Sequence, residues 1–348
     1  MLNTRIILST LFILAMSVGV GAAEITGAGS SAAKPIYTKW AEVYSQSSGV
    51  RLNYQPIGSS GGIKQIKAQA VDFGASDVAM SAEELKKEKL INFPSAISGV
   101  VPVINVPGIK AGELMLSGEI LADIFAGKIS YWNDPAIAAL NRGLALPKTA
   151  IVTVVRQDGS GTTYNFTDYL SKISPSWKEK FGKNFTIQWH EHALPAKGSS
   201  GIVTAVKQTS GAIGYVDYNY AVQERLNYVQ VKNRDGKFVA PTAASFSAAL
   251  NNSDWLKKAA FEEMLTDKAG ANSWPITMGT FIIIPRTAQH PESTIAAMKF
   301  FCWGFMQGDH LVAGMDFVRL PDKVQARIFK EMTEVTDAKG KPLQWSPM

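Results

Sequence analysis

Strand-like and helix-like segments alternate along the chain, and this alternation limits the possible fold more than any other feature. Short runs rich in β-branched and aromatic residues predict strands at residues 51–54, 100–106, 151–155, 212–218 and 281–284. Apolar residues three and four positions apart predict helices around residues 36–43, 63–70, 121–125, 166–173 and 324–328. Such alternation indicates an α/β fold with largely parallel sheets.

The composition is that of a folded protein with room for two domains. The chain has 348 residues, of which 46% are hydrophobic and 18% charged, so it can bury a substantial core. Its formal net charge of +6 is spread over the whole length, without a block of five or more basic residues. We therefore expect no nucleic-acid partner.

The first 23 residues have the three-part pattern of a secretory signal peptide. Arg5 precedes an apolar run from residue 6 to about residue 20, and the small residues Gly21, Ala22 and Ala23 follow. A membrane anchor is the alternative, but the apolar run is short for a transmembrane span. Cys302 is the only cysteine, so we expect neither an intramolecular disulfide nor lipid attachment at the cleavage site. These features predict export to the bacterial periplasm.

Two extended segments marked by proline and glycine, residues 92–108 and 274–285, resemble crossings between domains. The sequence thus predicts a discontinuous first lobe, residues 24–96 plus 275–348, and a second lobe, residues 97–274. Two crossings form a hinge, and a ligand binds in the cleft between lobes joined in this way.

One local theme recurs four times, as loops of glycine and hydroxyl residues that precede a helical pattern. They cover residues 26–32, 58–62, 158–163 and 197–201. Free N–H groups and the positive end of the dipole at a helix start attract anions, glycine lets the backbone approach closely, and hydroxyls add neutral donors. Any single loop can be a plain helix cap. Four together on one α/β scaffold favour an oxyanion site.

Enzyme and metal alternatives have weaker support. There is no Walker loop and no dinucleotide-binding G-x-G-x-x-G after a strand. Residues 58–62 satisfy G-x-S-x-G with Ser60 as nucleophile, which leaves a phosphohydrolase as an alternative, but none of the four histidines stands in a distinctive loop. His190 and His192 alone do not make a metal site. We expect no cofactor, no metal and no catalytic residues.

Long segments of the chain closely resemble the periplasmic phosphate-binding protein of the high-affinity phosphate ABC transporter. They include "TGAGSSAAKPIYTKWAEVY", "YQPIGSSGGIKQIKAQAVDFGASD", "VVRQDGSGTTYNFTDYL", "GAIGYVDYNYA", "LADIFAGKISYWNDPAIAALN", "WPITMGTFIII" and "LPDKV". The resemblance covers essentially the whole mature chain. It implies a periplasmic-binding-protein fold, inorganic phosphate held between two α/β lobes, delivery to the membrane permease subunits, a monomer and no enzymatic activity.

The resemblance also implies a set of ligand residues on these loops. They are Ser31, Ala32, Ser59, Asp77, Arg156, Ser160, Gly161 and Thr162. The first loop departs from the family, because "SSAAKP" replaces a more usual "ATFPAP". Ser31 keeps the hydroxyl and Ala32 the N–H, whereas Lys34 adds a cation that we expect to point to solvent.

The chemistry of these residues fits a protonated oxyanion. Arg156 offers a fork of donors, and Asp158, two residues later, can hold its guanidinium in place. The carboxylate of Asp77 only accepts hydrogen bonds, so it can pair with the proton of phosphate but not with unprotonated sulfate. Asp77 as a cap for the next helix is the alternative, although Ser81 suits that role better, with Glu84 three residues later. A receptor for sulfate or molybdate, and an additional adhesion role, stay open as alternatives.

Overall fold

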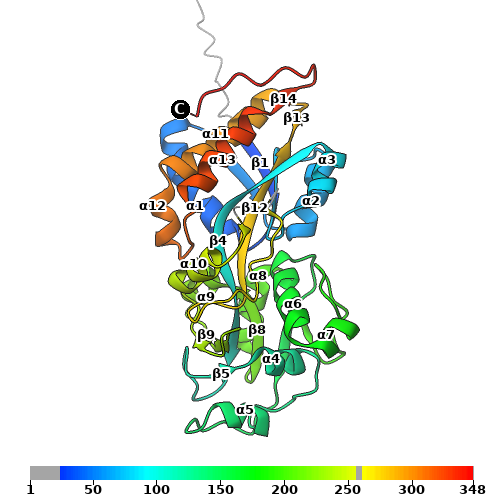
Figure 1. Ribbon diagram of the computed structural model, residues 1–348, viewed down its shortest axis with the longest axis vertical. Coiled ribbons are helices and arrows are strands. Elements are labelled where there is room, and N and C mark those ends of the chain that lie inside the picture. Colours follow the sequence, from blue (N-terminus) through cyan, green and yellow to red (C-terminus); the bar gives the residue numbers. More distant parts are fainter. Residues whose placement is uncertain (1–23, 256–260, 348) are drawn as a thin grey trace, which may run out of the picture.

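The computed structural model describes residues 24–255 and 261–347, so the predicted signal peptide lies outside the described residues. The molecule is elongated, with two halves stacked along its long axis (Figure 1). We call the half that contains the first and last described residues lobe 1 and the other half lobe 2. In the described part of the chain, no helix is long and apolar enough to cross a membrane.

Lobe 1 combines elements from both ends of the chain (Figure 1). From the N-terminal side come β1 (Glu24–Gly29), α1 (Lys34–Ser48), β2 (Arg51–Gln55), α2 (Ser59–Lys67), β3 (Phe73–Ser76) and α3 (Ala82–Glu88). The C-terminal side adds β13 (Thr287–Ala288), α11 (Pro291–Met306), α12 (Asp309–Gly314), α13 (Asp322–Thr333) and β14 (Thr336–Asp337).

Lobe 2 is built from the middle of the chain. It contains β5 (Met115–Leu116), α4 (Gly118–Phe125), α5 (Pro135–Leu140), β6 (Val152–Arg156), α6 (Gly161–Ile173), α7 (Pro175–Lys180), β7 (Leu194–Ala196), α8 (Gly198–Gln208), β8 (Ala212–Asp217), α9 (Tyr218–Gln223), β9 (Asn227–Tyr228), β10 (Gln230–Lys232) and β11 (Phe238–Val239). Helix α10 (Ala243–Asn251) packs on the two long strands that join the lobes.

Two long strands, β4 (Leu90–Asn105) and β12 (Thr277–Pro285), join the lobes through one continuous sheet. The strand order is β2-β1-β3-β12-β4-β8-β6-β7, with β9 also on β4. Strand β4 pairs with β12 as far as Gly99 and with β8 from Val100 onward. The predicted crossing at residues 96–97 therefore falls inside β4, and the one at residues 274–275 falls just before β12.

The expectation of largely parallel sheets holds only within each lobe. Strands β1, β2 and β3 are parallel, as are β6, β7 and β8. Strand β12, however, is antiparallel to both β3 and β4, and β4 is antiparallel to β8. The physical reason is the connectivity, because β4 leads from lobe 1 into lobe 2 and β12 leads back.

Aromatic side chains fill the core of each lobe. In lobe 1, Tyr37 on α1 contacts Phe301 on α11 with ring centroids 5.6 Å apart. In lobe 2, Phe166 on α6 stacks on Tyr215 on β8 at 4.5 Å. Burial of such side chains contributes about 2 kcal/mol each. It makes each lobe a firm support for the loops at the sheet edge.

Candidate functional site

The four hydroxyl-glycine loops meet where the two lobes touch. Each connects a strand to a helix: β1 to α1, β2 to α2, β6 to α6, and β7 to α8. We number them first to fourth in chain order. Their contacts across the lobe boundary include the Ser31–Ser199 hydroxyl pair at 2.8 Å and the Ser60 N–H donating to the Gly159 carbonyl at 3.1 Å. The predicted convergence of the loops is thus present in the fold.

Two glycines of the third loop allow this close approach. A Cβ on Gly159 would lie 1.6 Å from the Ser60 Oγ. One on Gly161 would lie 2.4 Å from the Ser59 Oγ and 2.7 Å from the Asp77 Cβ. A side chain at position 159 would displace the Ser60 hydroxyl, and one at position 161 would clash with Asp77 itself, so both glycines favour close contact of the loops.

Asp77 stands at the centre of the cluster, directly after β3, and is only 2% exposed. Its Oδ1 accepts hydrogen bonds from the hydroxyls of Ser30, at 2.6 Å, and Thr280, at 3.1 Å. In the described part of the chain, its Oδ2 has a single, long contact, with the Ser59 hydroxyl at 3.4 Å. Burial raises the pKa of Asp77, and these hydroxyls together with the charge of Arg156 oppose the rise.

The polar groups of the first loop have partners that the sequence did not predict. The Ser31 hydroxyl pairs across the cleft with Ser199, while the Ser30 hydroxyl contacts Asp77. The N–H of Ala32, predicted as a ligand donor, already donates to the Ser30 Oγ at 3.1 Å. Ser30 was absent from the predicted set. Its only signal in the sequence is the replacement of the family's alanine by a hydroxyl residue.

Arg156 ends β6 and is buried, with its side chain 2% exposed. Its Nε donates to the Asp158 Oδ1 at 2.7 Å, and its Nη2 donates to Oδ2. Burial alone would raise the pKa of Asp158, but Arg156 lowers it below its usual value. Asp158 also accepts from the Gly198 N–H at the start of α8, at 2.9 Å. This arrangement fixes the guanidinium and leaves the other edge of its fork for an anion.

The start of α6 carries three polar groups with different partners. The Ser160 Oγ caps the helix by accepting from the Thr163 N–H at 3.1 Å. The Gly161 N–H donates to the Ser59 Oγ at 3.1 Å. The Thr162 Oγ1 is buried and has no hydrogen-bond partner among the described residues. An orphaned buried hydroxyl is costly, and it marks a position where a ligand can restore the missing bond.

Two further expectations agree with the structure. The Ser81 side chain caps α3 by accepting from the Glu84 N–H at 3.2 Å, so Asp77 is not the cap. Lys34 is exposed, as expected.

The enzyme and metal alternatives gain no support from the histidines. His190 is hydrogen-bonded to Thr153, and His310 to the Gln307 carbonyl, so neither is placed as a base for Ser60. The described residues include no group of three or more His, Cys, Asp or Glu side chains that could hold a metal ion.

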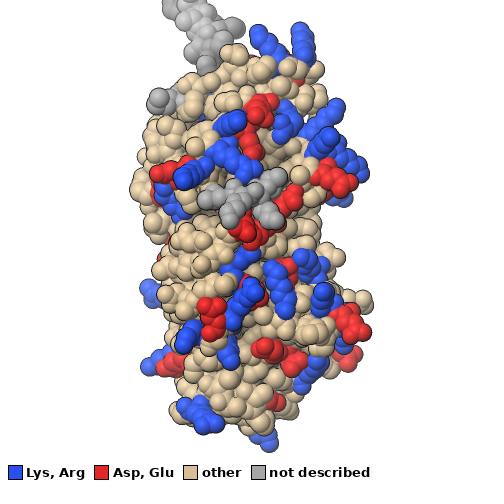
Figure 2. Space-filling view, in the orientation of Figure 1, with Lys and Arg blue, Asp and Glu red and all other residues tan. Residues whose placement is uncertain are grey.

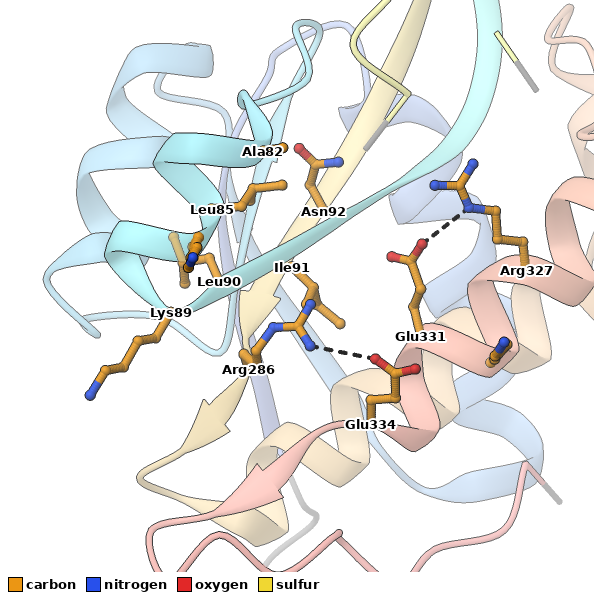
Figure 3. Close-up of a pocket in the computed structure, with 12 residues that line it drawn as sticks. Ala82, Leu85, Lys89, Leu90, Ile91, Asn92, Arg286, Arg327, Glu331 and Glu334 are labelled. Carbon is orange, nitrogen blue, oxygen red and sulfur yellow. Dashed lines mark hydrogen bonds and ion pairs between the residues drawn. The ribbon is translucent and has the colours of Figure 1, made fainter. Parts of the chain in front are cut away.

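A cavity of about 620 Å³ lies away from these loops, on the surface of lobe 1. Its walls come mainly from α3, the start of β4 and α13 (Figure 3). Arg286 contacts Glu334 at 3.5 Å and Arg327 contacts Glu331 at 3.2 Å, so acids on its wall face two of its cations. On the same face of the molecule, Figure 2 shows basic and acidic side chains interspersed.

Comparisons with known proteins agree with this architecture. A model of the PBP superfamily domain matches residues 17–305. The phosphate-binding protein PstS of Pasteurella multocida is 47% identical over 323 residues, which cover 92% of this chain and 94% of that protein. The phosphate-binding protein PstS of Haemophilus influenzae is 45% identical over 305 residues, or 88% and 91% of the two chains.

Among solved structures, the phosphate-binding protein of Stenotrophomonas maltophilia aligns with a TM-score of 0.69 at 20% identity, over 92% of this chain and 97% of that one. This likeness shows that the two proteins share a fold. The match to the family model and the identity to the PstS proteins go further, and place the chain in the PBP superfamily and, within it, in the family of phosphate-binding proteins PstS.

Proposed function

We propose that this protein is a periplasmic receptor that binds inorganic phosphate between its two lobes and delivers it to the membrane permease of an ABC transporter. It acts as a receptor and not as an enzyme. The relatives named as phosphate-binding proteins support the ligand class. The N-terminal signal pattern supports export.

The observation that carries the proposal is the position of Asp77 at the lobe boundary: the charge of Arg156 acts on its carboxylate, and a Cβ on Gly161, next to Thr162, would lie 2.7 Å from the Asp77 Cβ. Arg156 supplies charge, and the buried Thr162 hydroxyl supplies a neutral donor without a protein partner. Together with the N–H groups at the starts of α2 and α6, these side chains suit a dehydrated oxyanion. Because Asp158 already neutralises Arg156, fixed dipoles do most of the binding.

Asp77 gives the site its preference among oxyanions. Its ionised carboxylate only accepts hydrogen bonds, and phosphate carries at least one proton at neutral pH whereas sulfate carries none. Sulfate would place two acceptors face to face. A site of this kind can reject an analogue that lacks the bond by about 10⁴-fold.

The ligand set that we propose contains the eight predicted residues, with Ser31, Ala32, Ser160 and Gly161 in supporting contacts, because a hydroxyl or N–H group of each already has a protein partner. The proposed lobes are residues 24–96 with 275–348, and residues 97–274. Strands β4 and β12 are the two connections about which the lobes open and close, and the close contact of Ser60 with Gly159 corresponds to the closed form.

Calorimetric titration of the mature protein with phosphate, arsenate and sulfate tests the proposal. We expect tight binding of phosphate, weaker binding of arsenate, which also carries a proton, and no measurable binding of sulfate. Equal affinity for sulfate and phosphate would contradict the proposed hydrogen bond between the proton of the ligand and the Asp77 carboxylate. Incubation with a chromogenic phosphate ester checks the receptor role, and we expect no turnover.

A further inference from the structure

Ser30 holds a fixed position between the first helix and Asp77. Its N–H donates to the Ala75 carbonyl at 2.9 Å, and its carbonyl accepts from the Tyr54 hydroxyl at 2.7 Å, so the backbone is held on both sides. The side chain is buried as well, because the whole residue is 1% exposed. Its hydroxyl therefore has little freedom to choose other partners.

The Ser30 hydroxyl connects the start of α1 to the carboxylate. Its oxygen accepts from the N–H groups of Ala32, at 3.1 Å, and Ala33, at 3.3 Å. Both lie at the positive end of a 15-residue helix. With its lone pairs occupied, the hydroxyl must direct its single proton to the Asp77 Oδ1, 2.6 Å away. Hydrogen bonds in such a chain polarise and strengthen one another.

This contact makes the two oxygens of Asp77 different. Oδ1 is taken up by Ser30 and by Thr280, which donates from β12 at 3.1 Å. Among the described residues, Oδ2 has a single, longer contact, in which the Ser59 hydroxyl donates at 3.4 Å while its oxygen accepts from the N–H groups of Asp77 and Gly161. A carboxylate oxygen has two lone pairs, and this contact uses one of them. Oδ2 is therefore the oxygen left for a ligand between the lobes.

We propose that Ser30 is a specificity-determining positioning residue, which keeps Asp77 an acceptor and presents Oδ2 to the proton of the bound oxyanion. This inference rests on the proposed function and names a residue outside the predicted ligand set. Ser30 acts through Asp77 and the N–H groups of α1, not by touching the ligand itself.

The charges around Asp77 give the sign of the expected pH effect. Burial raises the pKa of Asp77, the Ser30 hydroxyl lowers it, and Arg156 on β6 also lowers it. The other titratable groups that act on Asp77 or are acted on by it are Tyr37 on α1, Tyr54 on β2, Asp217 on β8 and Tyr220 on α9. Loss of the Ser30 hydroxyl therefore lets Asp77 take up a proton at higher pH. A protonated Asp77 can donate to sulfate.

The test compares Ser30→Ala and Thr280→Val with the wild type. Phosphate and sulfate affinities are measured by calorimetry between about pH 5 and pH 8. Ser95→Ala is the matched control, because it removes another buried hydroxyl of lobe 1, which contacts Tyr37 and not Asp77. Ser30→Thr keeps the hydroxyl and serves as the rescue variant. A melting temperature recorded for each variant identifies any that fails to fold.

We expect Ser30→Ala to reduce the preference for phosphate over sulfate by about 10- to 100-fold, the range for a lost hydrogen bond to a charged group. Its loss of preference on acidification should begin at higher pH than in the wild type. Thr280→Val should act in the same direction with a smaller effect, because its bond is longer. Ser95→Ala and Ser30→Thr should keep the wild-type preference.

Two results would overturn the inference. Unchanged selectivity at every pH in both Ser30→Ala and Thr280→Val would show that the hydroxyls do not set the behaviour of Asp77. A rise in phosphate affinity with unchanged selectivity would show instead that Ser30 competes with the ligand for the N–H groups of Ala32 and Ala33. A wild-type protein that does not bind phosphate would contradict the proposed function itself, and so the two failures are distinguishable.

Discussion

The first and third hydroxyl-glycine loops are made of similar residues, but their polar groups have different partners. In the first loop, the Ser30 and Ser31 hydroxyls are both taken up by the protein, by Asp77 and Ser199. In the third loop, the Thr162 hydroxyl is buried without a partner among the described residues, and Arg156 keeps one edge of its guanidinium free of Asp158.

This difference indicates that the two lobes contribute different groups to the proposed site. The first loop belongs to lobe 1 and fixes Asp77, the acceptor that we propose pairs with the proton of the ligand. The third loop belongs to lobe 2 and, in the proposed site, supplies donors for the ligand's oxygens. Changes in the first loop and in Asp77 should therefore alter selectivity, whereas changes in the third loop should alter affinity.

The largest effect is expected for Asp77→Asn, measured as the ratio of phosphate to sulfate affinity. The amide can donate a hydrogen bond to sulfate, so the preference for phosphate should fall, by as much as about 10⁴-fold. In the wild type the same loss should appear on acidification, because the pKa of Asp77 is raised by burial and a protonated carboxyl also donates. Competition titrations that show unchanged selectivity would remove Asp77 from the proposed role.

Arg156→Ala should weaken phosphate binding strongly with little change in selectivity. The variant loses the guanidinium that faces the proposed anion site. It also loses about 2–5 kcal/mol of folding free energy, partly because Asp158 is left buried without its guanidinium partner. The double variant Arg156→Ala/Asp158→Ala should recover stability but not affinity, since it removes the unpaired charge. Arg51→Ala, at an exposed arginine on β2, is the control and should bind as the wild type does. Wild-type affinity in Arg156→Ala would contradict the assignment.

Thr162→Val should lower phosphate affinity by about fivefold without lowering stability. The expected loss is that of one hydrogen bond, about 1 kcal/mol, and removal of an unpaired buried hydroxyl carries no penalty in the free protein. Thr167→Val is the matched control on the same helix, because its Oγ1 donates to the Thr163 carbonyl at 2.9 Å. That variant should lose stability and keep its affinity. If both variants behaved alike in calorimetry and thermal unfolding, the Thr162 hydroxyl would not be held for a ligand.

Ser31→Ala and Ser199→Ala should have smaller effects that do not add. The two hydroxyls bond each other at 2.8 Å across the lobe boundary, so either change removes this contact of the closed form, and Ser31→Ala also removes the bond that the Ser31 Oγ accepts from the Ser199 N–H at 3.2 Å. We expect a few-fold loss of phosphate affinity for either variant, and about the same loss for the double variant. Fully additive losses in the double-mutant cycle would indicate that Ser31 contacts the ligand directly, as the family resemblance implies.

The sequence predicts the general architecture well because its strong signals are local. Helices α1, α4, α6 and α13 follow their apolar spacing, and β2, β6 and β8 lie where β-branched runs predict them. Strands β1 and β3 were not among the predicted strands, since "EITGAG" and "FGAS" are short and rich in small residues. Gly74 of β3 lets α2 pack closely on the sheet, because a Cβ there would lie 2.9 Å from the Ile66 Cγ2 and 3.0 Å from the Gly62 carbonyl oxygen.

The candidate site was predictable as a set of loops but not as a set of contacts. Arg156 and Asp158 are two residues apart, and their pairing follows from that spacing. Thr280 lies 203 residues from Asp77, and nothing local in the sequence indicates that its hydroxyl reaches the carboxylate. Which of the adjacent serines 30 and 31 faces Asp77 depends on the backbone direction after β1, and only the folded chain fixes it.

The smallest effect on binding is expected for Asp217→Asn. Asp217 is a second buried carboxyl, and its environment can be compared with that of Asp77. The Asp217 Oδ1 accepts from the Asn219 N–H at 2.9 Å, but its Oδ2 and the Asn219 Oδ1 are buried without partners among the described residues. Burial raises the pKa of Asp217 to about 8, and the nearby Ser98 hydroxyl and the Asn219 N–H only partly offset this rise. Asp77, by contrast, receives three hydroxyl contacts that oppose the effect of burial.

The folded protein therefore retains the Asp217 proton up to about pH 8, whereas the unfolded chain loses it near pH ~4. Between these values the unfolded state binds fewer protons, so this group makes stability fall as pH rises. Asparagine has no carboxyl proton to lose. Thermal unfolding should show Asp217→Asn more stable than the wild type at pH 8, by at least about 2 °C, with the difference disappearing near pH 4. Phosphate selectivity should not change. A stability difference independent of pH would mean that Asp217 is already ionised in the folded protein. The number of hydrogen bonds would then not explain the difference between Asp217 and Asp77.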